Sequence, residues 1–166
     1  MRVATHFSGV EALRMAMEVE RREHRFFAAL ARKAKGGTLR EVFSGMAQDK
    51  AALLRSLRVK LGECPDEGFW DNEEEILPYL QRLPEELFNI AETVKKKLGR
   101  LSSDREALRL AIEVEERLAE YFRETAAASF HPEGKEVFIW LASEQEDHAG
   151  NLREKQGDQE SARVPG

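Results

Sequence analysis

The amino-acid sequence predicts an all-α fold, a four-helix bundle built from two duplicated helical hairpins with one long crossover. The balance of residue types, an internal duplication and four stretches of helical periodicity predict it. Of the 166 residues, 34% are charged and 8% are aromatic, with 5 Pro and 11 Gly. This balance is typical of long solvated helices, so an all-β fold is excluded. At this length we expect one domain with one core.

The duplication has an offset of 95 residues. The segment ALRMAMEVERR at 12–22 matches ALRLAIEVEER at 107–117, and EVF at 41–43 falls on EVF at 136–138 without a gap. The offset exceeds the roughly 20 to 50 residues of solenoid repeats. We therefore expect two copies of one large unit.

Each copy is predicted to be a helical hairpin, the first at 10–61 and the second at 104–155. Helical periodicity is interrupted inside each copy, at the Gly-Gly pair 36–37 and at the His-Pro pair 131–132. The stretches that remain are 10–34 and 38–61 in the first copy, and 104–129 and 134–155 in the second.

The segment between the hairpins, 62–103, is predicted to be a long crossover. Three prolines, Pro65, Pro78 and Pro84, divide it into short pieces with one or two modest helices. Two hairpins joined in this way form a bundle of the one-crossover kind over residues 1–156. The polar end of the sequence, 157–166, is expected to be a flexible tail.

Charge and cysteine content restrict the partners. Lys and Arg total 26 and Asp and Glu total 31, a net charge of -5 with both signs interspersed, so we expect no nucleic-acid partner. The sequence contains no run of about 18 apolar residues and no signal-peptide core, so we expect no membrane association. The single Cys64 cannot form an internal disulfide or a CxxC metal site, and a cytoplasmic location is the simplest expectation.

Polar side chains interrupt the stripes that should face the bundle axis. The stripes are Leu13, Ala16, Glu20 and Phe27; Phe43, Met46, Lys50, Leu53 and Leu57; Leu108, Ala111, Glu115 and Phe122; and Phe138, Leu141, Gln145, His148 and Leu152. A buried, unpaired carboxylate costs several kcal/mol, so Glu20 and Glu115 need water, a proton, a partner or a metal. Their duplicated positions, with His148 at the same depth, favour a shared polar site over loose solvation.

These residues resemble the rubrerythrin-like proteins of the ferritin-like (diiron-carboxylate) superfamily. The first and third helices are similar to the family's A-x-E-x-E run, at 16–20 and 111–115. The second and fourth are similar to its F-x-x-L-A-x-x-E-x-x-H motif, at 43–53 and 138–148. The resemblance implies a ferritin-like bundle that holds two irons and reacts with peroxide or oxygen.

Three of the six motif ligands are altered. Lys50 and Gln145 stand where the resemblance implies bridging glutamates, and Leu53 stands where it implies a histidine. The ligands that carry over are Glu20, Glu115 and His148, with Glu144 as a candidate fourth ligand and His24 as a further candidate. Two divalent metals beside only two carboxylates and an ammonium leave an excess of positive charge, which disfavours a normal diiron centre.

Three functions therefore stay open. The first is an iron-dependent oxidoreductase acting on peroxide or oxygen, with an external electron donor because one cysteine excludes a rubredoxin module. The second is a non-redox mononuclear binder of zinc, manganese or iron. The third is a metal-free vestigial bundle in which Lys50 is salt-bridged to Glu20 and Glu115, acting as a structural or protein-interaction module. A homodimer is expected in each case.

Overall fold

The structure, a computed structural model, describes residues 9–62 and 85–163. These residues form five helices and no strand, which confirms the all-α prediction. The helices are α1 (Gly9–Lys33), α2 (Gly37–Lys60), α4 (Glu85–Gly99), α5 (Asp104–Ala128) and α6 (Pro132–Arg163).

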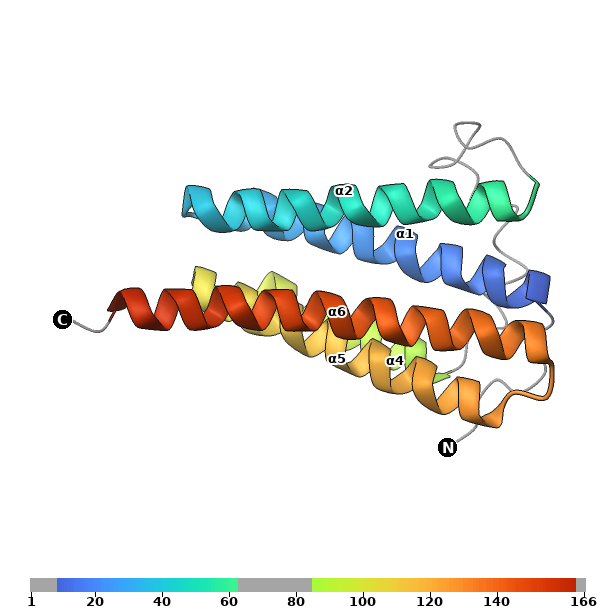
Figure 1. The fold of residues 1–166 in the computed structure, drawn as a ribbon. Helices are drawn as coiled ribbons and strands as arrows, with labels where there is room; N and C mark the ends of the chain where they lie inside the picture. The colour runs from blue at the N-terminus through green and yellow to red at the C-terminus, as the bar shows by residue number, and fades with distance from the viewer. Residues whose placement is uncertain (1–8, 63–84, 164–166) are drawn as a thin grey trace.

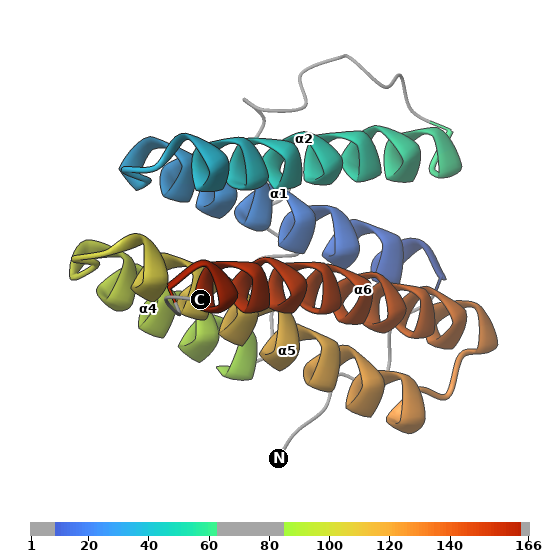
Figure 2. The ribbon, with the colours of Figure 1, turned by 60° about the vertical axis from the view of Figure 1, so that its left-hand side comes forward.

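Two antiparallel hairpins form the bundle (Figure 1). Helix α1 packs along α2, α5 packs along α6, and the hairpins meet chiefly where α1 contacts α6. Helix α4, from the second half of the crossover, lies against α5 on the outside of the bundle (Figure 2). The first half of the predicted crossover, from residue 63 to residue 84, lies outside the described residues.

Hydrogen bonds connect the two hairpins at the start of α5. Ser103 caps this helix, since its side chain accepts a hydrogen bond from the Glu106 amide at 3.1 Å. The Asp104 carboxylate accepts from the amides of Lys35 and Gly36, at 2.9 and 2.8 Å. Because those amides belong to the turn between α1 and α2, one carboxylate fixes that turn to the second hairpin.

Two aromatic pairs repeat the duplication in space. Phe27 packs on Phe43 with ring centroids 6.4 Å apart, and Phe122 packs on Phe138 at 6.2 Å. All four rings are fully buried, and the two pairs occupy equivalent positions of the two copies. The pairs lie on opposite sides of the polar centre described below, since Phe27 and Phe43 lie toward the α1–α2 turn and Phe122 and Phe138 lie toward the α5–α6 turn, at the other end of the bundle (Figure 1).

Helix α6 is longer than the sequence predicts. It continues to Arg163, past residue 157, where we expected a flexible tail to begin. The added turns lie beside α5, where Glu160 Oε1 is 3.9 Å from Arg105 Nη2. Within the described ranges, no helix is both long enough and apolar enough to cross a membrane.

Candidate site at the centre of the bundle

Polar side chains from four helices meet inside the bundle, between the two aromatic pairs. Each is between 0% and 8% exposed. They are Glu20 and Glu23 of α1, Lys50 of α2, Glu115 of α5, and Gln145 and His148 of α6, which we call the central cluster.

Lys50 is the hub of the central cluster. Its Nζ donates to Glu23 Oε2 at 3.0 Å and to Gln145 Oε1 at 3.1 Å, and it lies 3.0 Å from His148 Nδ1. The carboxylates of Glu20 and Glu115 are each 3.5 Å away. One ammonium group therefore contacts every other member of the cluster, and it occupies the centre itself.

Gln145 links two of these carboxylates, those of Glu20 and Glu23. Its Nε2 donates to Glu23 Oε2 at 2.7 Å and to Glu20 Oε1 at 3.2 Å. Three carboxylate oxygens still lack a hydrogen-bond partner among the described residues: Glu20 Oε2, Glu23 Oε1 and Glu115 Oε1. The first of these still faces Lys50 Nζ, at ion-pair distance.

Helical spacing explains why these side chains converge. Glu20 and Glu23 are three residues apart on α1, as are Gln145 and His148 on α6, and residues three apart share one face of a helix. Lys50 and Gln145 occupy equivalent positions of the two copies, so the pseudosymmetry of the bundle brings them face to face. The duplication therefore accounts for part of the site, namely Glu20 with Glu115 and Lys50 with Gln145.

Burial changes the acidity of the carboxyl groups. It raises the pKa of Glu20 from 4.5 to about 8, although the charge on Lys50 partly opposes the shift. Burial also raises the pKa of Glu23 to about 8, and the neighbouring charge on Glu115 adds to the effect. The pKa of Glu115 is raised for the same reason, with Lys50 again opposing the shift.

The two basic groups respond in opposite directions. Burial lowers the pKa of Lys50, but the charges on Glu115, Glu23 and Glu20 outweigh burial and keep that pKa above its ordinary range. Burial, and then the charge on Lys50, lower the pKa of His148. The imidazole is therefore neutral at pH 7, and its Nδ1 can accept a hydrogen bond from Lys50.

The cluster contains more acidic groups than basic groups that carry a charge. Three ionised carboxylates and one ammonium leave two negative charges in a dry interior, which is costly. Protons on Glu20 and Glu23 remove both charges at neutral pH, in keeping with their pKa values of about 8. What remains is the ammonium of Lys50 and one negative charge among the three carboxyl groups.

The structure brings together the candidate ligands Glu20, Glu115 and His148. Glu144 is half-buried and makes no hydrogen bond or ion pair with the cluster. His24 points elsewhere, since its Nδ1 lies 2.8 Å from the carbonyl oxygen of Ala47. The contacts of Lys50 with both Glu20 and Glu115 match the salt bridge of the metal-free hypothesis.

Sequence reasoning missed Glu23, which has the shortest ionic contact with Lys50. The sequence did contain an indication of its position. Glu23 lies three residues after Glu20 and four before Phe27, so it continues the alternating spacing of the α1 stripe. The equivalent residue of the second copy is Leu118, so the duplication argued against a polar role there.

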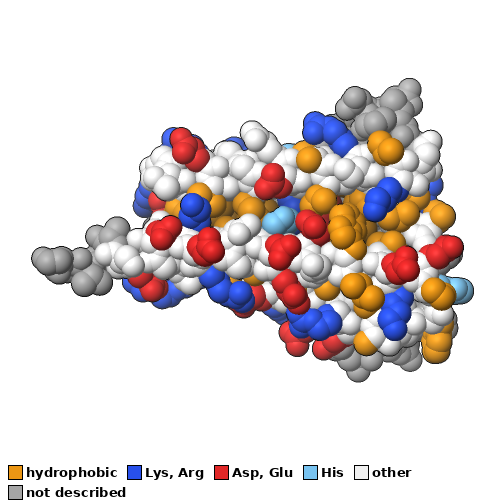
Figure 3. Space-filling model, viewed as in Figure 1, with side chains coloured by type: hydrophobic (Ala, Val, Ile, Leu, Met, Phe, Trp, Pro, Cys, Tyr) orange, Lys and Arg blue, Asp and Glu red, His pale blue; other side chains and the backbone are white. Residues whose placement is uncertain are grey.

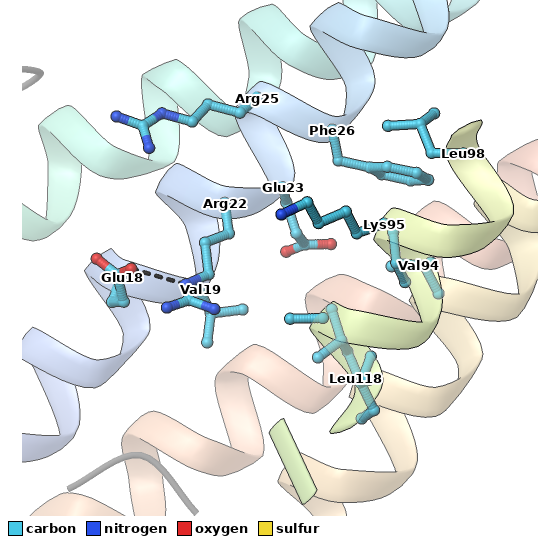
Figure 4. Close-up of a pocket in the computed structure, with 13 residues that line it drawn as sticks. Glu18, Val19, Arg22, Glu23, Arg25, Phe26, Val94, Lys95, Leu98 and Leu118 are labelled. Carbon is cyan, nitrogen blue, oxygen red and sulfur yellow. Dashed lines mark hydrogen bonds and ion pairs between the residues drawn. The ribbon is translucent and has the colours of Figure 1, made fainter. Parts of the chain in front are cut away.

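A mostly apolar cavity of about 280 Å³ lies beside the cluster, between α1, α4 and α5. Glu23 belongs to both, since it also lines the cavity (Figure 4). Arg22, Arg25 and Lys95 line it as well, and the view shows Lys95 extending over Glu23. Glu23 thus stands between the buried cluster and the more open cavity.

Comparison of the sequence with models of protein families gives one match. The family model described as Rubrerythrin matches residues 11–154, nearly the whole of the bundle. The chain belongs to the rubrerythrin family. Neither the curated proteins nor the solved structures contain a match to this chain. Membership confirms the resemblance that the sequence carries, and it suggests descent from diiron-type metal-binding proteins.

The central cluster does not fit the dinuclear centre that the rubrerythrin family implies. Lys50 Nζ occupies the space between the carboxylates, within 3.5 Å of all three. Among the residues that the structure describes, no group of three or more His, Cys, Asp or Glu side chains is arranged to hold a metal ion. A metal could enter only if Lys50 left the centre, and two divalent metals would still leave excess positive charge beside that ammonium.

The raised pKa values predict that acid stabilises the fold. Glu20 and Glu23 titrate at about 8 in the folded protein and near 4.5 when unfolded, so the folded state binds more protons between these values. Their contribution to the free energy of unfolding is therefore present below about pH 4.5 and is lost as the pH rises to about 8.

Urea unfolding across this pH range measures the effect. Glu20→Gln combined with Glu23→Gln should flatten the profile, because neither amide titrates. A profile that is as steep in the double variant as in the parent would assign the pH dependence to other groups.

Proposed function

We propose that this protein is a rubrerythrin-family bundle that works without metal, with Lys50 in place of the irons. The observation that carries this proposal is the ammonium of Lys50, fully buried and in contact with Glu20, Glu23 and Glu115 at 3.0 to 3.5 Å. A cation that belongs to the chain performs the electrostatic work of a metal, since it holds the carboxylates of α1 and α5 against α2. Such a bundle is a structural or protein-interaction module.

An oxidoreductase acting on peroxide or oxygen is the function that the family suggests. It would need a redox-active iron and an electron donor from outside the chain. The position of Lys50 opposes it, because the ammonium fills the space between the carboxylates that iron would need. We therefore place this function behind the metal-free module.

A mononuclear metal binder is the second candidate, and the charge of the cluster favours it. With Glu23 included, the three carboxylates and Lys50 carry two negative charges, which one divalent cation would balance. Two protons balance the same charges, and the raised pKa values of Glu20 and Glu23 support protonation of both. The two candidates differ only in what neutralises the cluster.

Thermal unfolding with and without metal separates these functions. We expect the unfolding midpoint to be unchanged by chelators and by added ferrous iron, zinc or manganese. A bound ion would stabilise the fold by about 2.7 kcal/mol at one hundred times its dissociation constant. A midpoint that rises with one metal and falls with its chelator contradicts the metal-free proposal and supports the mononuclear site.

The partner that we propose for the module is a second copy of the chain. Figure 3 shows hydrophobic side chains gathered between α2 and α6, toward the end where α6 begins. Val59 near the end of α2 is 58% exposed, and Lys60 of α2 lies over the Trp140 ring of α6. Ile139 of α6 is 53% exposed and lies on the side of α6 that faces α5. Lys135 lies beside Ile139 on α6, and Glu146 follows farther along the same surface. A twofold axis there would bring opposite charges together around an apolar centre.

Light scattering tests this contact. We expect the mass of two chains for the parent and of one chain for Ile139→Glu, with unchanged helical content. A parent that is monomeric at every concentration, or a variant that stays dimeric, contradicts the proposed surface.

A further inference from the structure

The cavity between α1, α4 and α5 has the size and the walls of a site for a small apolar molecule. Its volume is about 280 Å³, whereas an engineered cavity of roughly 150 Å³ in another protein holds benzene. One ring would leave space in it, and two fused rings come closer to filling it. The apolar walls include Val19 and Phe26 of α1, Ile90 and Val94 of α4, and Leu118 of α5.

The walls of the cavity are in place without a ligand. Val19, Phe26 and Leu118 are buried, so the bundle itself holds them in position. Helix α4 supplies the remaining wall and packs against α5. Ligand sites are typically preformed apolar cavities in which a few polar groups select the ligand. The polar groups of this cavity therefore identify the class of ligand.

Glu23 brings a buried polar atom to the cavity. Its Oε2 already accepts from Lys50 Nζ and Gln145 Nε2 in the central cluster. Its Oε1 is buried and has no hydrogen-bond partner among the described residues. Figure 4 shows the carboxyl group of Glu23 beside the cavity, with Lys95 extending over it. Because buried polar atoms normally have a partner, a ligand that bonds to this oxygen completes the site.

A hydroxyl group matches both polar groups at this point of the cavity. It can donate its hydrogen to Glu23 Oε1 and accept a hydrogen bond from the ammonium of Lys95. It suits Glu23 in either protonation state, because a neutral carboxyl group also accepts and donates. An amine would meet the positive charges of Lys95 and Arg22, and a carboxylate could not donate to Glu23. The site therefore favours a neutral group that both donates and accepts.

We propose that the cavity between α1, α4 and α5 binds a phenol with two fused rings, whose hydroxyl group lies between Glu23 and Lys95. Its rings pack against the apolar side chains of the three helices, Phe26 among them, and so connect α4 to α1. The inference goes beyond the proposed function, because that function concerns what occupies the centre of the bundle, whereas this ligand lies under α4.

Equilibrium dialysis of the full chain at neutral pH tests the class of ligand. The three probes share one pair of fused rings: naphthol has a hydroxyl group, naphthalene has no polar group, and naphthoate has a carboxylate. We expect naphthol to bind about tenfold more tightly than naphthalene, which is the effect of one added hydrogen bond, and more tightly than naphthoate. Equal affinities for naphthol and naphthalene, tighter binding of naphthoate, or no binding of any probe would each overturn the proposal.

Two variants of α1 test the hydrogen bond to Glu23. Glu23→Leu introduces the residue type of Leu118, its equivalent in the second copy, and removes the oxygen. We expect its affinity for naphthol to fall about tenfold, to that for naphthalene, while the affinity for naphthalene stays unchanged. Glu18→Gln is the matched control, because Glu18 lines the same cavity but accepts from Arg21 and Arg22. If Glu23→Leu keeps the preference for naphthol, or the control loses it, Glu23 does not select the ligand.

Two variants of α4 test the position of the site. Ala91 lines the cavity, so Ala91→Phe should fill part of it and weaken binding of both naphthol and naphthalene about tenfold or more. Glu92 is the next residue on α4, is exposed and does not line the cavity, so Glu92→Phe should leave both affinities unchanged. Equal affinities in the two variants would place the site elsewhere.

The three probes decide the proposal on the parent chain even if Glu23→Leu does not fold. Metal content separates this proposal from the proposed function. A parent that binds naphthol selectively and also holds a metal contradicts the proposed function and leaves the phenol site standing. A metal-free parent that binds none of the probes does the reverse.

Discussion

Replacing Lys50 with methionine is expected to lower the free energy of unfolding by about 3 to 5 kcal/mol near neutral pH. Methionine has a similar length but no charge, so the carboxylates of Glu20, Glu23 and Glu115 lose the ammonium that they share. Breaking a buried ion pair costs more than the pair contributes, because the remaining charge stays in a dry interior. Urea or thermal unfolding measures the loss.

The pH dependence of this loss identifies its cause. Acid protonates the carboxyl groups and removes the unpaired charge, so Lys50→Met should recover part of its stability as the pH falls from neutral toward about 5. Lys96→Met is the matched control, since Lys96 is exposed on α4 and should change stability by about 0.5 kcal/mol or less. If Lys50→Met is no less stable than this control, the ammonium does not hold the bundle together.

Restoring the altered ligand positions is expected to create a metal centre. The triple variant Lys50→Glu, Leu53→His and Gln145→Glu places the family's ligand types at all six positions of its motif. Two divalent cations then meet five buried carboxyl groups, Glu23 included, and one proton neutralises the charge that is left. We expect about two irons per chain after anaerobic loading, on the ligand count of the diiron-carboxylate bundles.

The triple variant also needs a control that keeps its charge pattern nearly unchanged. Adding Glu115→Gln removes one ligand without changing its volume, and metal content should fall sharply. If the triple variant binds no more iron than the parent, the alignment of Lys50, Leu53 and Gln145 with metal ligands is wrong.

The fold could be predicted from the sequence because its signals are local and repeated. The matched segments at 12–22 and 107–117 predict two equal hairpins, and the structure places them as α1–α2 and α5–α6. The end of α6 could not be predicted so well. Its last turns contain polar residues, and they lie beside another helix, as Glu160 does next to Arg105 of α5. Periodicity along one helix does not contain that information.

The centre of the site was only partly predictable. The duplication pointed to Glu20 and Glu115, and helical spacing placed His148 at the same depth. Charge arithmetic pointed to Lys50 as their internal counterion. Glu23 was hidden because the second copy has an apolar residue at the equivalent position. Its inclusion changes the balance of the cluster, since a third carboxylate requires protons, or one cation, in addition to Lys50.

The relation between Glu23 and its neighbours also explains why the cluster tolerates three acids. Gln145 donates to both Glu20 and Glu23, so an amide in place of a bridging glutamate removes a negative charge and supplies two hydrogen bonds. Lys50 in place of the other glutamate adds a positive charge. The two replacements act together, and they convert a set of metal ligands into a network that is closed by the chain itself.

Metal content of the parent chain tests this account most directly. The protein is incubated anaerobically with ferrous iron, and in parallel with zinc and manganese; loosely bound ions are removed, and metal per chain is counted by elemental mass spectrometry. Lys50 at the centre predicts none. One ion per chain would show that a cation displaces Lys50 and balances the three glutamates, and two would show that the diiron centre of the family persists. Either of these results contradicts the claim that Lys50 has replaced the metal.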